Sequence, residues 1–412
     1  DGNNTWNIGP DAVNGNTGFK QFDKIDLGKG DVLNFIYSYI KQKGYSVDWN
    51  PDNGTHGVTV NANQRGTIDT FISLINSGAS INGIVNALQS ANGALKTDGN
   101  LVFISPNGMV VGASGVINVG NLSVISPTQT SYDKLSDYLA LPKHQVSNIS
   151  SIRVVENNPI TQGKYKLDIG YDNNVLVAEG TNKTLNLSTL TDGAGNQLVL
   201  GGKEIRVDAG GKIAARGNVD LQGGTIANNG LLLAGLGNNH TAALTGHDAA
   251  DQLFTNLVNT DNMGTANTFI NNNGNISIKS VTGTSVGNGA AIKNYGKGSI
   301  TINNSGADGI SFAGEVSNPN GATTIKNTNG ALLVDTTGRI ASGGSALAVN
   351  NSSLLVSNEG AGGMDIQGKV LVNHSNKTNT VNFVNKNSDM KIGSTAVNKN
   401  IESNADVNIA VT

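Results

Sequence analysis

Two histidines and two aspartates lie close enough in the sequence to suggest a metal site. His240 and His247 are seven residues apart, which is two turns of an α-helix, so one helix face could present both imidazoles. Asp248 and Asp251 follow and could add carboxylate ligands. Histidine pairs of this kind are more often exposed polar positions than ligands, so we predict no metal and no other cofactor.

Acid–base chemistry on a polysaccharide would need clustered carboxylates and a neighbouring base. The Asp and Glu residues are dispersed, and Asp208 and Asp220 are twelve residues apart, which would place them on different faces of a repeating strand fold. The arginines are equally scattered: Arg65, Arg153, Arg206, Arg216 and Arg339. We predict that the chain is not an enzyme, and a polysaccharide-active enzyme remains an alternative.

The composition favours many short strands joined by turns. Gly supplies 54 of the 412 residues, charged residues make up 14%, and hydrophobic residues 37%. Average proteins carry roughly 25% charged residues. The formal net charge of −3 gives no concentrated positive face, so we expect no nucleic-acid partner. Cysteine is absent, which excludes disulfides and thiolate metal sites.

A repeat of short apolar pairs determines the predicted fold. Through the second half, aliphatic residues recur at positions i and i+2 with Gly, Asn or Asp on either side, and such pairs share one strand face. Equivalent pairs are spaced by 22 to 24 residues: Ile276 to Ile300, Ile300 to Thr323, Ile310 to Leu332 and Leu332 to Leu354. This interval is typical of one coil of a parallel β-helix. The sequence therefore predicts an all-β, right-handed parallel β-helix (solenoid).

Several segments interrupt the repeat. We predict an N-terminal cap at about residues 1–35, in which Trp6 plugs the end of the core, although Trp6 and Trp49 could also form a sugar platform. Extra-helical excursions are expected near residues 41–66, 131–150 and 237–267, the last two with helix-like spacing. Residues 67–90 fit either a helix or strands. The predicted organisation is a first unit at 1–130, an excursion at 131–150 and further coils over 151–412.

Three stretches resemble the N-terminal secretion domain of the filamentous haemagglutinin family of two-partner-secretion exoproteins, which includes large leukotoxin-like adhesins. They are "NTGFKQFDKIDLGKGDVLNF" at 16–35, "INGIVNALQSANG" at 81–93 and "NLVFISPNGMVVGASGVINVGNLSVISPT" at 100–128. The third is similar to the family's Asn-Pro-Asn-Gly motif, with Ser105 in place of the first Asn. In Ser105-Pro106-Asn107-Gly108, Pro presets a turn, Asn tolerates positive φ and Gly completes the reversal.

The resemblance implies a secreted or surface-exposed adhesin of a diderm bacterium, exported through the periplasm. Its first 130 residues would be recognised by a dedicated outer-membrane barrel transporter with POTRA domains, and the rest would be a scaffold. The residues implied in recognition or folding are Phe19, Phe22, Ser105, Pro106, Asn107 and Gly108. Host-cell receptors or glycans are further expected partners, and we expect a monomer.

Other classes of exported protein fit the same resemblance. The full-length protein could be an adhesin, a cytolysin or a growth-inhibition stalk. A monomeric autotransporter passenger, with its barrel on the same chain, is a competing interpretation. The sequence names neither a receptor nor a ligand.

Overall fold

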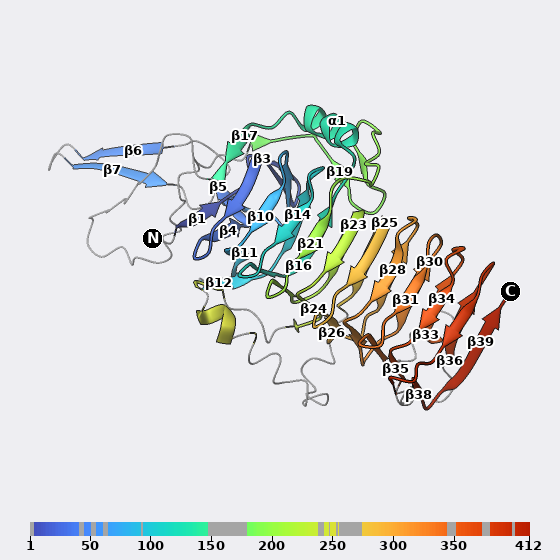
Figure 1. Ribbon diagram of the computed structural model, residues 1–412. Coiled ribbons are helices and arrows are strands. Elements are labelled where there is room, and N and C mark those ends of the chain that lie inside the picture. Colours follow the sequence, from blue (N-terminus) through green and yellow to red (C-terminus); the bar gives the residue numbers. More distant parts are fainter. Residues whose placement is uncertain are drawn as a thin grey trace.

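The computed structural model describes residues 4–40, 45–50, 55–60, 65–91, 94–146, 179–237, 243–246, 248–252, 254, 274–343, 352–372, 380–397 and 400–412. Short strands stack in successive layers along the molecule, with the N-terminal layers at one end and the C-terminal layers at the other (Figure 1). Two large sheets carry most of these strands, and nearly all their pairings are parallel.

The first sheet has one strand from each layer. In order of pairing its strands are β1 (Thr5–Ile8), β4 (Val32–Ile36), β11 (Ile84–Ala91), β15 (Val116–Val119), β22 (Lys212–Ala215), β24 (Leu231–Ala234), β26 (Ala291–Asn294), β29 (Glu315–Asn318), β32 (Arg339–Ser342), β35 (Lys369–Val372) and β38 (Ile401–Ser403). The strand β12 (Ala94–Thr97) pairs antiparallel with β11 at the edge.

The second sheet collects the remaining strands of the stack. They are β2 (Ala12–Asn14), β3 (Thr17–Leu27), β9 (Thr70–Ile75), β10 (Ala79–Ile81), β13 (Asn100–Ile104), β14 (Met109–Val111), β16 (Asn121–Ile125), β17 (Lys143–Gln145), β18 (Glu179–Gly180), β21 (Ile205–Val207), β23 (Val219–Asn228), β25 (Ile276–Val286), β27 (Ile300–Asn304), β28 (Gly309–Phe312), β30 (Thr323–Asn327), β31 (Leu332–Val334), β33 (Ser352–Asn358), β34 (Met364–Ile366), β36 (Thr380–Asn385), β37 (Met390–Ile392) and β39 (Asp406–Val411).

Eight strands of the second sheet close into a ring of parallel pairings, in the order β3, β9, β13, β16, β23, β21, β14 and β10, with β10 returning to β3. The ring closes because β3 and β23 are long, with 11 and 10 residues. Each pairs with two strands of the ring, β3 with β9 and β10, and β23 with β16 and β21. The prediction of a simple right-handed parallel β-helix is therefore wrong. The fold is a closed eight-stranded parallel barrel with further strands stacked outside it.

The predicted strand spacing is right in most places and wrong in one. Ile276 pairs with Ile300, Ile300 with Thr323, and Ile310 with Leu332, as the 22 to 24 residue repeat requires. Leu332, however, pairs with Met364, and Leu354 pairs with Thr323. The interval is longer here because β33 begins ten residues after the end of β32.

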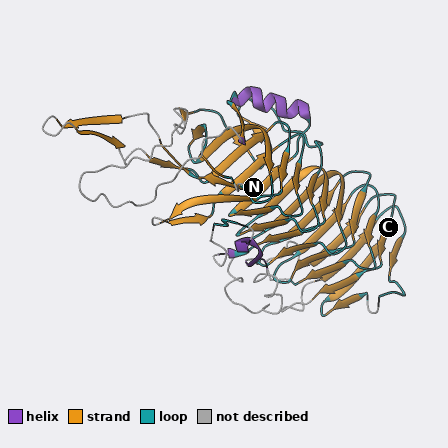
Figure 2. Cartoon of the chain, turned by 60° about the vertical axis from the view of Figure 1, so that its left-hand side comes forward, coloured by secondary structure: helices purple, strands orange, loops and turns teal. Residues whose placement is uncertain are grey.

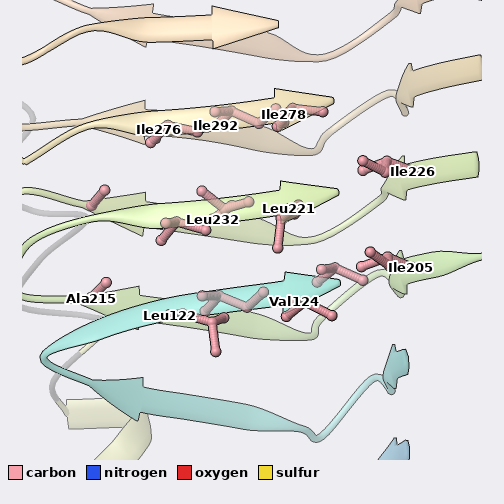
Figure 3. Packing of buried hydrophobic residues seen from close by; sticks show 14 of the residues in the cluster. Leu122, Val124, Ile205, Ala215, Leu221, Ile226, Leu232, Ile276, Ile278 and Ile292 are labelled. Carbon is pink, nitrogen blue, oxygen red and sulfur yellow. The ribbon is translucent and has the colours of Figure 1, made fainter. Parts of the chain in front are cut away.

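Apolar side chains inside the stack form continuous columns. Val124, Leu221 and Ile278 occupy one position in successive strands, and Ile205 and Ile226 occupy another (Figure 3). All five are at most 1% exposed. Burial of an aliphatic side chain of this size contributes roughly 1.5–3 kcal/mol, so these columns are the main source of stability.

A ladder of buried asparagines runs alongside the apolar columns. Asn304 donates from Nδ2 to Oδ1 of Asn327 at 2.8 Å, Asn327 to Asn358 at 2.7 Å, and Asn358 to Asn385 at 2.8 Å. The four side chains are at most 2% exposed. Each carboxamide satisfies its neighbour in the next layer, because a buried amide is tolerated only with hydrogen-bond partners.

The segments outside the large sheets lie close to the predicted excursions. Residues 41–66 include the antiparallel hairpin of β6 (Tyr45–Asn50) and β7 (Thr55–Val60), next to the antiparallel pair β5 (Ser38–Ile40) and β8 (Arg65–Thr67). The helix-like spacing near residue 131 belongs to α1 (Gln129–Leu139), which lies over one side of the stack (Figure 2). A short hairpin of β19 (Leu185–Asn186) and β20 (Thr191–Asp192) follows. The ambiguous residues 67–90 form β9, β10 and most of β11.

The N-terminal end differs from the predicted cap at residues 1–35, because β3 is a strand of the ring and β4 a strand of the first sheet. Trp6 lies on β1 and packs half-buried against the main core. The strand β2 pairs antiparallel with β3, but β17 and β18 also pair with β3 and β2, and Val146 joins the core at 4% exposure. Residues 143–145 and 179–180 therefore add strands beside β3 and β2, which the sequence did not predict.

Candidate functional site

The Ser-Pro-Asn-Gly segment forms a tight turn between β13 and β14. The carbonyl oxygen of Ser105 accepts a hydrogen bond from the Gly108 amide at 3.2 Å, which closes a four-residue turn with Pro106 at its second position. Oγ of Ser105 accepts from the Asn107 amide at 3.3 Å. A serine hydroxyl can thus make the side-chain turn that Asn makes in related motifs.

The positive φ of this turn belongs to Gly108, at +72°, and not to Asn107. The expectation that Asn107 would use its tolerance of positive φ is wrong. Asn107 instead donates from Nδ2 to the carbonyl oxygen of Asn76 at 2.8 Å, and so connects the turn to the layer before it. The Lys203 amide donates to the carbonyl oxygen of Pro106 at 2.8 Å from the layer after it.

The turn stacks between the layer before it and the layer after it, and backbone hydrogen bonds join it to both. The Ala79 amide donates to the carbonyl oxygen of Gly108 at 3.3 Å, and the Met109 amide donates to that of Glu204 at 3.2 Å. Ser105, Pro106 and Gly108 are buried, and Asn107 is half-buried. The polar atoms of the motif are therefore used to hold three consecutive layers in register, which is a structural use.

Phe19 and Phe22 lie on opposite faces of β3. Phe22 is fully buried inside the stack, where its ring meets Phe35 edge-on with centroids 6.3 Å apart. Phe19 is 1% exposed and points outward into a second apolar cluster with Ile72 and Val102. The structure therefore does not bring the two phenylalanines together with Ser105–Gly108 into one exposed patch.

Helix α1 covers Phe19 and the other outward apolar residues of this cluster. Its Tyr132, Leu135 and Leu139 are at most 5% exposed. Gln21 of β3 donates from Nε2 to Oγ of Ser136 at 2.8 Å, and burial raises the pKa of Tyr132 well above its ordinary value. Thr128 caps the helix by accepting from the Ser131 amide at 3.4 Å, as N-cap threonines do.

A charged cluster at the N-terminal end was not foreseen from the sequence. Asp11 accepts from Lys20 Nζ at 2.6 Å through Oδ1, and its Oδ2 lies 2.8 Å from His144 Nε2. Lys20 and Asp11 are 7% and 18% exposed. The nine-residue spacing of Asp11 and Lys20 is compatible with a hairpin, but His144 is 133 residues away from Asp11, and no local pattern indicates that contact.

The remaining chemical candidates do not converge. His240 and His247 lie outside the described residues, as does the side chain of Trp49. Asp208 binds Nε of Arg206 at 2.7 Å, whereas Asp220 lies in another column of strands. In the described part of the chain, no group of three or more His, Asp or Glu residues is placed to hold a metal ion.

Asp220, on β23, is a largely buried carboxyl with a shifted pKa. Burial raises its pKa, and hydrogen bonds from Gln222 and Ser277 oppose the shift. Gln222 donates from Nε2 to Oδ2 of Asp220 at 2.7 Å. A buried carboxyl with a raised pKa can belong to an active site or be structural, and Asp220 has neither a second carboxylate nor a histidine among these contacts.

Among the described residues, no helix combines the length and apolar character needed to span a bilayer. Comparison with known proteins returned no matching protein family, no matching curated protein and no matching solved structure.

Proposed function

We propose that this chain is the N-terminal part of a large exported surface protein of a diderm bacterium. In this proposal residues 1–130 are recognised in the periplasm by an outer-membrane barrel transporter with POTRA domains. The later layers form a scaffold that holds adhesive regions away from the cell and contacts host receptors or glycans. The sequence resemblance at 16–35, 81–93 and 100–128 is the basis of the proposal.

The structural observation that supports it best is the stacked corner at Ser105–Gly108. Asn107 and Gly108 bind the layer before through Asn76 and Ala79, and the adjoining Met109 amide donates to Glu204 in the layer after. Each strand pairs mainly with the next layer, so the chain can fold by adding one layer at a time. Folding of this kind suits a chain that crosses a membrane unfolded, because each new layer finds its template already in place.

Secretion of variant chains tests the proposal. Residues 1–412 are expressed in a diderm host with a transporter of this class, and the exported fraction is measured. We expect Asn107→Ala and Gly108→Val to block export, and Asn303→Ala to leave it unchanged, because Asn303 is exposed on β27. Normal export of both corner variants, or export of the unchanged chain without the transporter, would refute the proposal.

A folding measurement separates the two ways in which these variants could act. Each variant is purified from the cytoplasm, unfolded in urea and diluted, and the recovery of β structure is followed by circular dichroism. A variant that refolds normally but is not exported has lost transporter recognition. A variant that fails in both assays has lost the corner that the layers need, which supports the folding role drawn from the contacts of Asn107 and Gly108.

A further inference from the structure

A second apolar surface lies on the outside of the N-terminal layers, on the first sheet. The outward residues of β4, β11, β15, β22 and β24 are apolar and at most 4% exposed: Val32, Ile84, Val116, Ala214 and Leu233. They are covered by Leu244, Ala250 and Phe254, which are also at most 3% exposed. The described residues 243–246, 248–252 and 254 are called the latch below, and residues 248–252 are helical.

Asn86 holds the latch through its side-chain amide. Its Nδ2 donates to the carbonyl oxygen of Leu244 at 2.9 Å, and its Oδ1 accepts from the Leu244 amide at 3.1 Å. Asn86 thus pairs with Leu244 in the way that one strand backbone pairs with another. The two residues are 158 positions apart, so the contact joins the second layer to a much later part of the chain.

The same side chain also belongs to an asparagine ladder within the sheet. Asn86 donates to Oδ1 of Asn34 at 2.9 Å and accepts from Nδ2 of Asn118 at 2.8 Å. With the two Leu244 bonds, all four hydrogen-bond positions of the carboxamide are filled. Because Asn86 is fully buried, opening the latch leaves two of these positions without their protein partner.

Lys212 holds the other end of the latch. Its Nζ lies 5.4 Å from the centroid of the Phe254 ring and 3.4 Å from Oδ1 of Asp251. Asp251 is 68% exposed, so this ion pair contributes little. The burial of Phe254 and Leu244 and the Asn86 clamp therefore provide most of the attachment.

We infer that the latch is a separately opening cover of the N-terminal layers, held closed by Asn86. The latch adds no strand to either large sheet, so it can leave the surface while every strand pairing stays intact. Elements attached by few buried contacts open locally with a smaller free energy than the paired strands beneath them. Opening exposes the apolar surface around Ile84, Val116 and Leu233 to solvent.

The latch makes full burial of the first layers dependent on residues that follow them by more than 100 positions. If the proposed export role holds, the outer surface of β11 and β15 stays uncovered until residue 254 has left the transporter. That consequence rests on the proposed function, whereas the latch itself does not. The test below uses purified, folded protein, so its result is independent of any secretion assay.

Thiol labelling in the otherwise cysteine-free chain measures opening directly. Ala250→Cys places one thiol in the latch, and Ala215→Cys places one in the inner core, where both alanines are fully buried. Folded 1–412 is treated with a thiol reagent without denaturant. We expect position 250 to react at least about 100-fold faster than position 215. Equal rates would show that the cover opens only with the whole stack and would overturn the inference.

Two asparagine substitutions identify the clamp. Asn86→Ala removes both bonds to Leu244, whereas Asn118→Ala interrupts the ladder and leaves those bonds in place. We expect Asn86→Ala to speed labelling at position 250 by about 10-fold or more without changing position 215, and Asn118→Ala to have no such effect. An equal effect of the two substitutions at position 250 would assign the effect to the ladder and contradict the role of Asn86.

If Asn86→Ala unfolds the chain, labelling will be fast at both position 250 and position 215. A third variant then tests the inference. Phe254→Leu keeps an apolar side chain and loses the ring that Lys212 contacts. In the folded chain it should speed labelling at position 250 alone. No change at position 250, or the same increase at position 215, would overturn the inference.

Discussion

The α-carbon of Gly108 lies directly against the backbone carbonyl of Glu204, and a Cβ at position 108 would overlap that oxygen. Gly15 has a similar positive φ, +56° against +72°, with nothing within 4 Å of its Cβ position. Gly108→Ala should therefore lose more stability than the roughly 1 kcal/mol expected from positive φ alone, and Gly15→Ala should lose only that amount. Urea unfolding of both variants measures the difference, and equal losses would refute the role of the Glu204 contact.

Phe19 and Phe22 should both be important for stability but for different parts of the molecule. Replacing either with Ala removes a buried ring and should lower the free energy of unfolding by about 3–5 kcal/mol. Phe19→Ala should in addition speed amide hydrogen exchange in α1, because Phe19 packs in the cluster that the helix covers. Phe22→Ala, inside the stack, serves as the control. Unchanged exchange in α1 in the Phe19 variant would contradict the assignment.

The buried asparagine ladder should be sensitive to the loss of a single member. Asn327→Ala removes the donor to Asn358 and the acceptor of Asn304. Each buried group left unpartnered costs about 1–3 kcal/mol, so the midpoint of urea unfolding should fall clearly. Asn303→Ala, one position before the ladder residue Asn304 and exposed, should leave the midpoint unchanged. Equal midpoints for the two variants would show that the ladder does not stabilise the layers.

Asp220 and Asp335 should respond to pH in opposite directions. Burial raises the pKa of Asp220 above its ordinary value of 3.8, so its contribution to stability is complete below that value and is lost as pH rises through the folded-state pKa. Asp220→Asn should therefore raise the thermal unfolding midpoint at pH 7. The gain should shrink near about pH 3, where the wild-type carboxyl is already protonated.

Asp335 is the matched control for that experiment. The hydrogen bond from the Thr336 hydroxyl, followed by that from the Thr337 amide, lowers its pKa. Its contribution is present above the ordinary pKa and lost as pH falls through the folded-state pKa. Asp335→Asn should slightly lower the unfolding midpoint at pH 7 and have a smaller effect near about pH 3. The same sign of change at pH 7 for both variants would contradict the two pKa assignments.

Local patterns in the sequence predicted three of the four strand pairings that the repeat specified. The i, i+2 pairs at Ile276, Ile300 and Ile310 lie in register with the partners that the repeat requires. The closed ring of eight strands could not be predicted in this way. It arises because β3 and β23 run on past the corner at which shorter strands end, and the apolar spacing within a strand does not say where that strand turns.

The candidate site likewise has one part that local sequence predicts and another part that depends on the folded structure. The turn at Ser105–Gly108 follows from Pro, Asn and Gly in sequence, whereas the contact of Gly108 with Glu204 depends on how two layers stack. The contacts of Asp11 with His144 and of Asn86 with Leu244 join residues 133 and 158 positions apart. No periodicity links such residues, so these contacts emerge only from the folded structure.

The stacking of layers also determines how the protein responds to mechanical force. Tension applied between the two ends of the stack acts along the inter-strand hydrogen bonds, so that the bonds between two layers share the load and successive layers carry it in series. The weakest junction should separate first and release one layer of chain. Ile310 and Leu332 mark such a layer of 22 residues, which extends to roughly 75 Å. Stretching of a single molecule would then proceed in steps of that length, each absorbing energy while the remaining layers stay folded.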